Sequence, residues 1–252
     1  MEFKDQVVLI TGSSRGIGRA TALAFSEKGA KVAVHYNRNV SAAEETISLL
    51  QGEGHLLLQA DISAPMEVES MIQKTQQHFG RLDIVVNNAG IFSAHPIDEV
   101  SYAEWLASWR NTLETNLIGA ANVCYCATQL MIPQGGGRII NVSSRGAFRG
   151  EPECPAYGAS KAGMNAMSQS LAKKLAPHNI GVYAIAPGFV ATDMAKSTLE
   201  GPEGDQVRQQ SPMGRVALPE EVAHAILFYA SPAAAFMTGG IMDVNGASYL
   251  RS

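Results

Sequence analysis

The stretch QVVLITGSSRGIG, residues 6–18, decides the fold of this chain. Gln6–Thr11 is a short β-branched run typical of a strand. Gly18–Glu27 has the apolar spacing of a helix, which Gly29 is expected to close as a C-cap residue. A strand, a glycine-rich turn and a helix in this order are the expected first unit of a parallel α/β sheet.

The glycine-rich turn, spaced GxxxGxG, is also a candidate phosphate-binding loop. Small residues let backbone amides approach a pyrophosphate at the N-terminus of a helix. The alternative is a tight strand-to-helix turn that binds no ligand. The position of the turn between a strand and a helix favours the binding loop.

Strand-like and helix-like segments alternate along almost the whole chain. Further strands are expected at Lys31–Tyr36, Leu56–Gln59, Leu82–Val86, Arg138–Val142, Gly181–Ile185 and Ile241–Val244. The alternation predicts an α/β fold, a doubly wound parallel sheet (Rossmann fold) of about seven strands in three α/β/α layers. We find no linker or internal repeat, so residues 1–252 are expected to form a single domain.

Helices are expected between these strands. Ser41 and Glu44 match a capping box, and Pro65 is a favoured first helical residue. Pro133, with the glycines after it, is expected to end a long helical stretch. The other expected ranges are Pro65–Gly80, Ser101–Met131, Tyr157–Leu175 and Glu220–Tyr229.

Residues 189–219 form the least regular stretch, rich in glycine and proline. A long irregular loop in a compact domain is usually functional or disordered. Because it follows the sixth expected strand, it lies at the carboxyl edge of the sheet, where ligands bind in such folds. We therefore predict a substrate loop, or lid, at 189–219.

Composition argues against several classes of protein. Hydrophobic residues make up 46% of the chain and charged residues 17%, which is typical of a folded globular protein. The formal net charge is −4 and no basic run occurs, so neither nucleic-acid nor membrane binding is expected.

Features of targeting predict a cytoplasmic protein. The N-terminus, MEFKDQVVLITG, contains acidic residues at once and has no secretory apolar region. No uninterrupted stretch of about 18 apolar residues occurs that could span a membrane. Cys124, Cys126 and Cys154 lack the spacing of metal ligands, so reduced thiols and no metal site are expected.

Tyr157 and Lys161 are four residues apart in a helical segment, so they share one helix face. A phenol has a pKa of roughly 10, and a nearby cation is expected to lower it. Such a pair can act as a general acid and base near neutral pH. The alternative is a surface pair without function.

Four motifs together resemble one family. TGSSRGIG (11–18), NNAG (87–90), Tyr157-x-x-x-Lys161 and PG (187–188) are collinear with those of the short-chain dehydrogenase/reductases, over essentially the whole chain. PGFVATDM (187–194) and the VNG near the C-terminus most resemble the 3-oxoacyl-carrier-protein reductase branch. The resemblance implies a nicotinamide-dependent oxidoreductase that reduces a ketone, of 3-oxoacyl or other small type, to a secondary alcohol.

The resemblance also implies the roles of four catalytic residues. Tyr157 gives a proton to the substrate oxygen as hydride leaves the nicotinamide, and Lys161 holds the nicotinamide ribose. Ser144, preferred to Ser143 because it lies 13 residues before Tyr157, steadies the substrate oxygen. Asn116 is expected to break a helix turn and hold a water that leads to the lysine; the alternative is a solvent-facing asparagine.

Asp61, after the third strand, would cap the adenine amino group, unless it is an ordinary turn or N-cap aspartate. The remaining implied cofactor contacts come from the glycine loop, the ends of the strands, the catalytic pair and the loop after the sixth strand. The full set is Gly12, Ser14, Arg15, Gly16, Ile17, Gly18, Asn37, Arg38, Asp61, Ile62, Asn88, Ala89, Gly90, Tyr157, Lys161, Pro187, Gly188, Val190 and Thr192.

NADP(H) is expected to be preferred, with NAD(H) possible as a substitute. NAD enzymes place an acid at the end of the second strand to bind the ribose 2′-hydroxyl. Here that position is Tyr36, and Arg15 and Arg38 lie near it instead. The planar fork of arginine suits a 2′-phosphate.

Three other functions were weighed. A serine hydrolase would need a GxSxG nucleophile elbow on a strand-to-helix turn, and the chain is expected to have none. A catalytically inactive NAD(P)-binding regulator on the same fold is the main alternative, since fold alone does not fix function. Sugar epimerases and dehydratases of the extended relatives are longer and have a different glycine spacing.

The substrate and the oligomeric state are the least determined properties. The carrier-protein reductases have basic docking residues where this chain has Gly135 and His178, although Arg138, Arg145 and Arg149 could substitute. A homotetramer, or at least a dimer, is expected. Relatives pair the helices before the fifth strand and after Tyr157, and here Leu117–Leu130 is apolar, with Gly163, Ala166 and Met167 on the second helix.

Overall fold

The computed structural model describes residues 3–251. Seven parallel strands form one sheet in the order β3-β2-β1-β4-β5-β6-β7. Their bounds are β1 Val7–Ile10, β2 Lys31–Tyr36, β3 Leu56–Gln59, β4 Ile84–Asn87, β5 Gly137–Val142, β6 Ile180–Pro187 and β7 Ile241–Val244. The predicted doubly wound parallel sheet is confirmed, and three of the expected strands have the predicted bounds.

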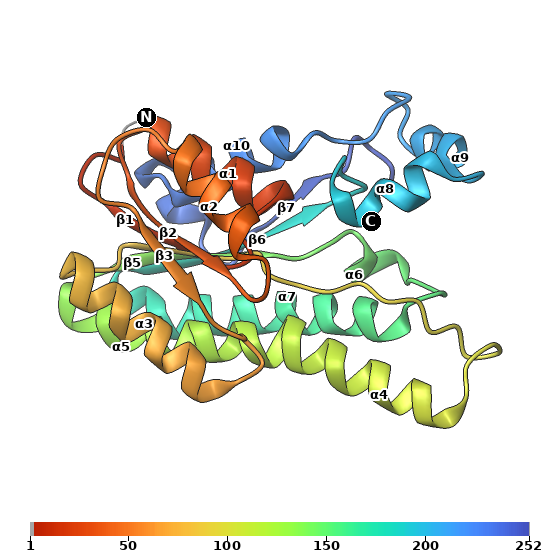
Figure 1. The fold of residues 1–252 in the computed structure, drawn as a ribbon, viewed down its shortest axis with the longest axis horizontal. Coiled ribbons are helices and arrows are strands. Elements are labelled where there is room, and N and C mark those ends of the chain that lie inside the picture. Colours follow the sequence, from red (N-terminus) through yellow and green to blue (C-terminus); the bar gives the residue numbers. More distant parts are fainter. Residues whose placement is uncertain (1–2, 252) are drawn as a thin grey trace.

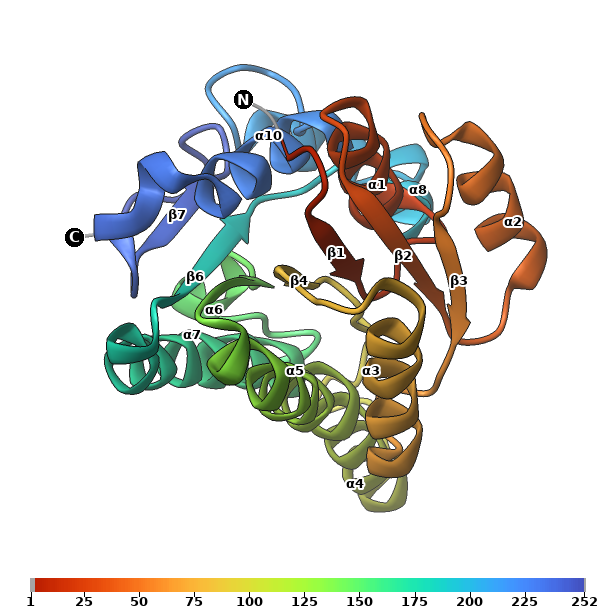
Figure 2. The ribbon, with the colours of Figure 1, turned by 90° about the vertical axis from the view of Figure 1, so that its left-hand side faces the viewer.

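Helices cover both faces of the sheet (Figures 1 and 2). One face carries α1 (Gly16–Glu27), α2 (Val40–Leu49) and α10 (Pro219–Ala230), which lie above the sheet in Figure 1. The other face carries α3 (Pro65–Phe79), α5 (Ala120–Gln134) and α7 (Pro155–Leu175). The predicted three layers are therefore present.

Alternation along the strands builds two hydrophobic cores. In β1, Val8 and Ile10 pack into the core beneath α1 and α10, whereas Val7 and Leu9 pack into the core above α3 and α5. Successive strand side chains point to opposite faces, so a strand covered on both faces must be apolar at every position. This explains why β1 is apolar at every position.

The remaining helices lie around the ends of the strands. They are α4 (Tyr102–Leu113), α6 (Gly146–Arg149), α8 (Asp193–Glu200) and α9 (Gly204–Gln209), with the 3₁₀ turns η2 (Ala176–His178) and η3 (Pro232–Met237). A π-helical segment, η1 (Glu114–Gly119), joins α4 to α5. Within residues 3–251, no helix combines the length and apolarity that a membrane crossing requires.

Two local expectations were wrong, and the expected helix end at Pro133 and the glycines after it was right only for the glycines. Asn39, not Ser41, caps α2, because its side chain accepts a hydrogen bond from the amide of Ala42. Pro133 lies inside α5, near its end, and the left-handed Gly135 at φ +92° is the residue that ends the helix. The stretch 189–219 is not a continuous loop, since it contains α8 and α9.

The strand order reverses between β1 and β4, which are neighbours in the sheet although β2 and β3 separate them in the chain. At such a point the loops at the carboxyl ends of the two strands diverge and leave a crevice for a ligand. The glycine loop and the NNAG segment both follow these two strands. The fold therefore brings the two motifs together.

Candidate active site

The glycine loop is held in place by hydrogen bonds with residues that directly follow β1 and β4. Asn88 Nδ2 donates to the carbonyls of Thr11 and Gly12, both at 3.0 Å. Thr11 Oγ1 accepts from the amides of Asn88 and Ala89, also at 3.0 Å. Gly12 and Gly16 have φ values of +65° and +54°, which favour glycine. The NNAG segment thus holds the glycine loop in its conformation.

His35 is a buried support of this loop that the sequence reasoning missed. Its Nδ1 accepts from the amide of Gly12 at 2.9 Å, while Nε2 lies 2.9 Å from the carbonyl of Ala60. Because Nδ1 accepts, the ring is neutral and Nε2 donates. Burial lowers the pKa of His35 accordingly. The available signal was a histidine within an otherwise apolar parallel strand.

The surroundings of α1 fit the pyrophosphate of a dinucleotide. The N-terminal turn of α1 contains no acidic residue, and Arg15 makes no capping hydrogen bond through its side chain. A Cβ at Gly18 would lie 2.3 Å from the carbonyl oxygen of Gly12, so only glycine lets the loop close on the helix. The positive end of the helix dipole then faces the loop, as anion binding requires.

A second cradle lies at Gly90, where a Cβ would lie 3.2 Å from Asn116 Oδ1 and 3.6 Å from Lys161 Nζ. The open surface at Gly90 therefore adjoins two of the predicted catalytic residues. This is the place where a ribose and a nicotinamide would lie if the pyrophosphate bound at α1. The residues present fit a nicotinamide dinucleotide.

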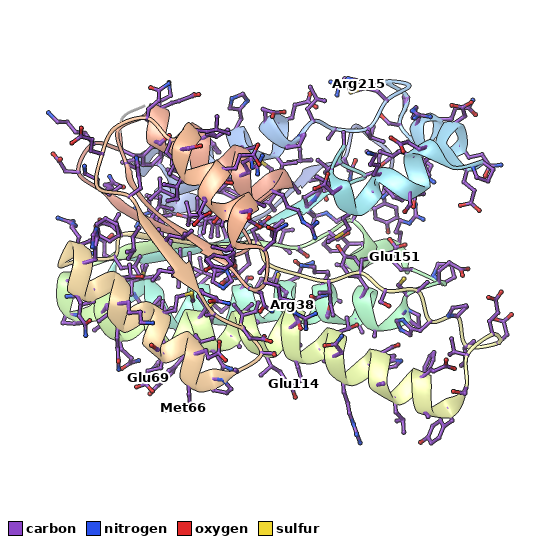
Figure 3. The ribbon with its side chains drawn as sticks, viewed as in Figure 1. Arg38, Met66, Glu69, Glu114, Glu151 and Arg215 are labelled. Atoms are coloured by element: carbon purple, nitrogen blue, oxygen red, sulfur yellow. The ribbon has the colours of Figure 1, made fainter. Side chains whose placement is uncertain are left out.

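The adenosine end of the proposed cofactor site contains Asn37, Arg38 and Asp61, at the carboxyl ends of β2 and β3. A hydrogen bond from the Ser63 side chain holds the pKa of Asp61 below its usual value, and the Asn37 side chain and the Arg38 charge lower it further. Asp61 Oδ1 also accepts from the Ser63 amide at 2.9 Å, so it forms a turn, and Ala64 rather than Asp61 is the N-cap of α3. Arg38, labelled in Figure 3, is exposed.

Arg15 connects the glycine loop with the predicted lid. Its Nη1 lies 3.9 Å from Asp193 Oδ2, and both side chains are 65% exposed. Beside this ion pair, a Cβ at Gly16 would lie 3.1 Å from the Thr192 methyl group. The beginning of α8 therefore rests directly on the glycine loop.

The other predicted cofactor residues lie around the same crevice. Ser14 accepts two hydrogen bonds from Arg19 through its carbonyl oxygen, and Ile17 packs against the core. Ile62 is buried, with its carbonyl close to Gly119 of η1. After β6, Pro187, Gly188 and Val190 pair with neighbouring segments through the bonds Arg145 N to Pro187 O, Gly188 N to Val244 O and the bridge from Val190 to Ala217.

Tyr157 and Lys161 lie on one face of α7, as expected. Lys161 Nζ is 5.7 Å from the centre of the Tyr157 ring and donates to the Val142 carbonyl at 2.7 Å. Burial lowers the pKa of Lys161 to about 8. The expected lowering of the tyrosine pKa is wrong: burial raises the pKa of Tyr157 to about 12 and outweighs the lowering by a Ser144 hydrogen bond.

The two serines after β5 have different surroundings. Ser143 is buried, and its hydroxyl donates to the Lys161 carbonyl at 3.2 Å, which ties β5 to α7. Ser144 is half-buried, accepts from the Gly146 amide at 3.0 Å and forms a side-chain hydrogen bond with Tyr157. Only Ser144 is therefore directed to the predicted proton donor.

Asn116 lies within η1 and is fully buried, so the solvent-facing alternative is wrong. Its Oδ1 accepts from the Ile91 amide at 2.8 Å and its Nδ2 donates to the Ile91 carbonyl at 2.9 Å. Nδ2 also lies 3.3 Å from Ser160 Oγ. The π-helical turn thus directs Asn116 to the segment after β4, beside Gly90.

The expectation that the chain has no GxSxG spacing is wrong. Residues Gly12 to Gly16 have the GxSxG spacing of a nucleophile elbow after all, so spacing does not exclude a hydrolase. A nucleophilic serine would need a histidine within hydrogen-bond distance. The nearest histidine, His35, uses its ring nitrogens on Gly12 and Ala60. Within residues 3–251 no hydrogen bond joins Ser14 Oγ to a histidine, which argues against a hydrolytic triad here.

Known proteins resemble this chain over nearly its full length. A family model described as enoyl-(acyl carrier protein) reductase matches residues 12–247. The 3-oxoacyl-acyl-carrier-protein reductase of Synechocystis sp. is 38% identical over 244 residues, 96% of each chain. That of Staphylococcus aureus strain Mu50 is 36% identical over 244 residues, which is 96% of this chain and 97% of the relative. A dehydrogenase/reductase structure from Sinorhizobium meliloti 1021 has a TM-score of 0.90 at 27% identity, covering 99% of this chain and 97% of the other.

These similarities show that the chain belongs to the short-chain dehydrogenase/reductase family. It is an enzyme, an oxidoreductase that uses a nicotinamide cofactor and acts on a carbonyl or hydroxyl carbon. The family model and the relatives name different reductions, so the family and this general chemistry are what they share.

Proposed function

We propose that the protein reduces a ketone, of 3-oxoacyl or other small type, to a secondary alcohol with NADPH as hydride donor. The observation that carries the proposal is the convergence of Ser144, Tyr157 and Lys161, with Lys161 beside Gly90. The inactive-regulator alternative has no support in this geometry, because an inactive site would not need a phenol hydrogen-bonded to a serine and paired with a buried amine.

The bound cofactor would supply the hydride, and the chain would supply the proton and the orientation. With its pKa raised to about 12, Tyr157 stays protonated at neutral pH and is ready to donate a proton to a carbonyl oxygen. Ser144 would share that oxygen as a second hydrogen-bond donor while negative charge develops on it. Reduction of a ketone consumes a proton, so a tyrosine that is protonated at the start of the reaction suits this direction.

Lys161 and Asn116 would restore the proton and hold the ribose. Lys161, with a pKa of about 8, exchanges protons readily at neutral pH. Asn116, fixed against Ile91, would hold the water that connects the lysine with solvent. The remaining predicted residues, from the glycine loop to Thr192, would bind the dinucleotide. The segment 189–219 would close over the substrate.

A panel of carbonyl compounds tests the proposal. Simple ketones, 3-oxoacyl thioesters and sugars would each be incubated with NADPH and with NADH, and oxidation of the cofactor followed by absorbance. Turnover of at least one ketone with NADPH is expected. An enzyme that oxidises neither cofactor with any of these compounds would contradict the proposed reduction.

We further propose a homotetramer, or at least a homodimer, built on α5 and α7, in the cytoplasm. Ile118 and Tyr125, just before and within α5, are 41% and 67% exposed, although both are apolar or aromatic. On α7, Ala166 is exposed and Gly163 packs against Leu117, which leaves a surface of small residues. All three cysteines are free thiols, as a reducing compartment favours. A monomer in light scattering at micromolar concentration would refute the assembly.

A further inference from the structure

Arg145, the residue after Ser144, is a buried cation with neutral partners. Its side chain leaves the residue only 3% exposed. Nη1 donates to Ser248 Oγ at 2.6 Å, Nη2 donates to Gln210 Oε1, and the guanidinium lies over the Phe189 ring at 5.0 Å. A buried charge is normally paired with an opposite charge, because burial without one costs several kcal/mol.

Glu151 attracts Arg145 electrostatically but forms no ion pair with it. Glu151, labelled in Figure 3, lies 3.8 Å from Arg149 Nε, which is its ion-pair partner. Within residues 3–251, no carboxylate oxygen lies within 4.0 Å of an Arg145 nitrogen. Burial lowers the pKa of Arg145 to about 10, so the side chain remains charged at neutral pH.

The guanidinium borders a cavity of about 160 Å³ between the lid and the C-terminal segment. The lining contributes apolar surface from Phe189, Val207 and Met213 on one side. The polar part includes backbone and side chains of the segment from Asn245 to Ser248. The cavity is thus a small apolar chamber with one cation in its wall.

The other charged residues of the lining are already paired. Glu221 accepts from Arg215 at 2.7 Å, and Arg215, labelled in Figure 3, lies on the connection between α9 and α10. Asp243 accepts from Arg251, also at 2.7 Å. These pairs cancel, so Arg145 gives the cavity a net positive charge. Its guanidinium has five N–H donors, and two hydrogen bonds leave donors for a further acceptor.

We propose that this cavity, which lies behind Ser144 on the side of the lid, binds the carboxylate of the substrate, which makes the enzyme a reductase of short oxo acids. The inference rests on the proposed function, since it names the class of ketone that the enzyme would accept. A carboxylate would provide the negative charge that Arg145 lacks, in a charge-assisted and potentially bidentate contact. A cavity of about 160 Å³ has room for a small organic molecule, such as a carboxylate with a few carbons.

The position of Arg145 supports the substrate as occupant rather than a separate effector. Arg145 directly follows Ser144 in sequence, and its amide donates to the Pro187 carbonyl at 2.9 Å, beside the predicted nicotinamide loop. Gln210 and Met213 belong to the predicted lid, so closing of the lid would close the cavity as well. The absence of arginine at positions 135 and 178 fits a free acid better than a docked carrier protein.

The test compares oxo acids with their methyl esters. Acetoacetate, 4-oxopentanoate and 5-oxohexanoate would each be paired with the ester, and kcat/KM measured with NADPH. Hydrogen bonds to a charged group contribute about 1.5–3 kcal/mol, so the best acid should exceed its ester by about ten- to a hundredfold. An enzyme that uses every ester as well as its acid would overturn the proposal.

Matched variants separate a binding role from a structural clamp. Arg145→Gln should abolish the preference for the acid, measured as the ratio of kcat/KM for the acid to kcat/KM for its ester. Gln210→Ala and Ser248→Ala remove the neutral partners but leave the cation, so both should keep the preference. If these two variants lost it as completely as Arg145→Gln, Arg145 would be a clamp and the proposal wrong.

A binding measurement covers the case in which Arg145→Gln fails to fold. Pentanoate, which has no carbonyl group to reduce, should raise the melting temperature of the wild type, and butan-1-ol should not. Pentanoate that neither stabilises the wild type nor inhibits it competitively would also overturn the proposal. If no ketone of any kind is reduced, the proposed function fails, whereas turnover of neutral ketones without acid preference removes only this inference.

Discussion

The glycine loop and the substrate lid are held by different kinds of contact. The loop is anchored by the sheet. Asn88 donates to the carbonyls of Thr11 and Gly12, His35 accepts from the Gly12 amide, and the Thr11 hydroxyl accepts from the Asn88 amide, all at about 3 Å. The lid is anchored by side chains from distant segments, through Arg145 to Gln210 and Ser248 and through the exposed pair of Arg15 and Asp193. Because the lid is tied to the rest of the protein mainly through side chains, we expect it to open at lower free energy than the loop.

This difference has a functional meaning. The cofactor is exchanged in each turnover but always has the same shape, which suits a rigid cradle, whereas a segment that covers the substrate must open to admit it and to release the product. The comparison predicts that changes in the loop alter cofactor binding, whereas changes beside the lid alter catalysis and substrate choice. Four predictions test this division, taken from the largest expected effect to the smallest.

Tyr157→Phe should lower kcat by about 10²- to 10⁴-fold, the usual contribution of a general acid, because the proton donor is lost. The dissociation constant for NADPH should change little, since the aromatic ring still packs against Phe92, whose ring centre is 5.0 Å away. Single-turnover rates and fluorescence titration with NADPH measure the two effects. A variant that keeps more than about a tenth of the wild-type rate would refute the role of Tyr157.

Gly18→Ala should weaken cofactor binding by about ten- to a hundredfold. A Cβ there would lie 2.3 Å from the Gly12 carbonyl oxygen and 2.6 Å from Asn88 Nδ2, and overpacking of this kind costs about 1–3 kcal/mol. Gly80→Ala is the control: it strains a left-handed residue at φ +75° but has no atom within 4 Å. Titration with NADPH should show a weakened Gly18 variant and an unchanged Gly80 variant; equal affinities would contradict the cradle.

Arg15→Ala and Arg38→Ala should each reduce the preference for NADPH over NADH by about tenfold or more, because charged hydrogen bonds contribute about 1.5–3 kcal/mol. Neither change should alter kcat with a saturating cofactor. The ratio of kcat/KM for the two cofactors measures the effect. Better use of NADH by the wild type would contradict the assignment, and so would an NADPH preference that survives loss of both arginines.

His35→Gln should change the pH dependence of stability. Because burial lowers the pKa of His35 in the folded protein, the unfolded chain binds more protons below its pKa of 6.5. The stabilisation from neutral His35 is complete above pH 6.5 and is lost as the pH falls towards the lower folded pKa. The slope is at most about 1.4 kcal/mol per pH unit.

Urea unfolding between pH 5 and 8 would measure this slope in the wild type, in His35→Gln and in His178→Gln, which changes an exposed histidine. Below pH 6.5, the wild type and the His178 variant should lose stability more steeply than the His35 variant. Parallel curves for all three proteins would show that His35 does not make this contribution.

Much of the fold could be predicted from local patterns. Continuous apolar runs such as Val7–Ile10 predict strands covered on both faces, and the glycine spacing after β1 predicts a close approach of backbone to helix. The local predictions that were wrong concerned places where two nearby residues could each have had the same role. Asn39 and Ser41 could both cap a helix, and the structure chose the residue whose side chain reaches a free amide.

The candidate site also has parts that the sequence predicts and parts that depend on the tertiary structure. The sequence by itself determined the fold class, the phosphate loop and the pair of Tyr157 and Lys161, because each depends on residues that are close in the chain and follow a helix or strand period. Only the tertiary structure decided the pKa of Tyr157, the support of the glycine loop by His35 and the burial of Arg145 against Gln210 and Ser248. Arg145 is 65 and 103 residues from these two partners. Contacts of this kind, and the desolvation that shifts a pKa, depend on which distant segments the sheet brings together, and no local pattern contains that information.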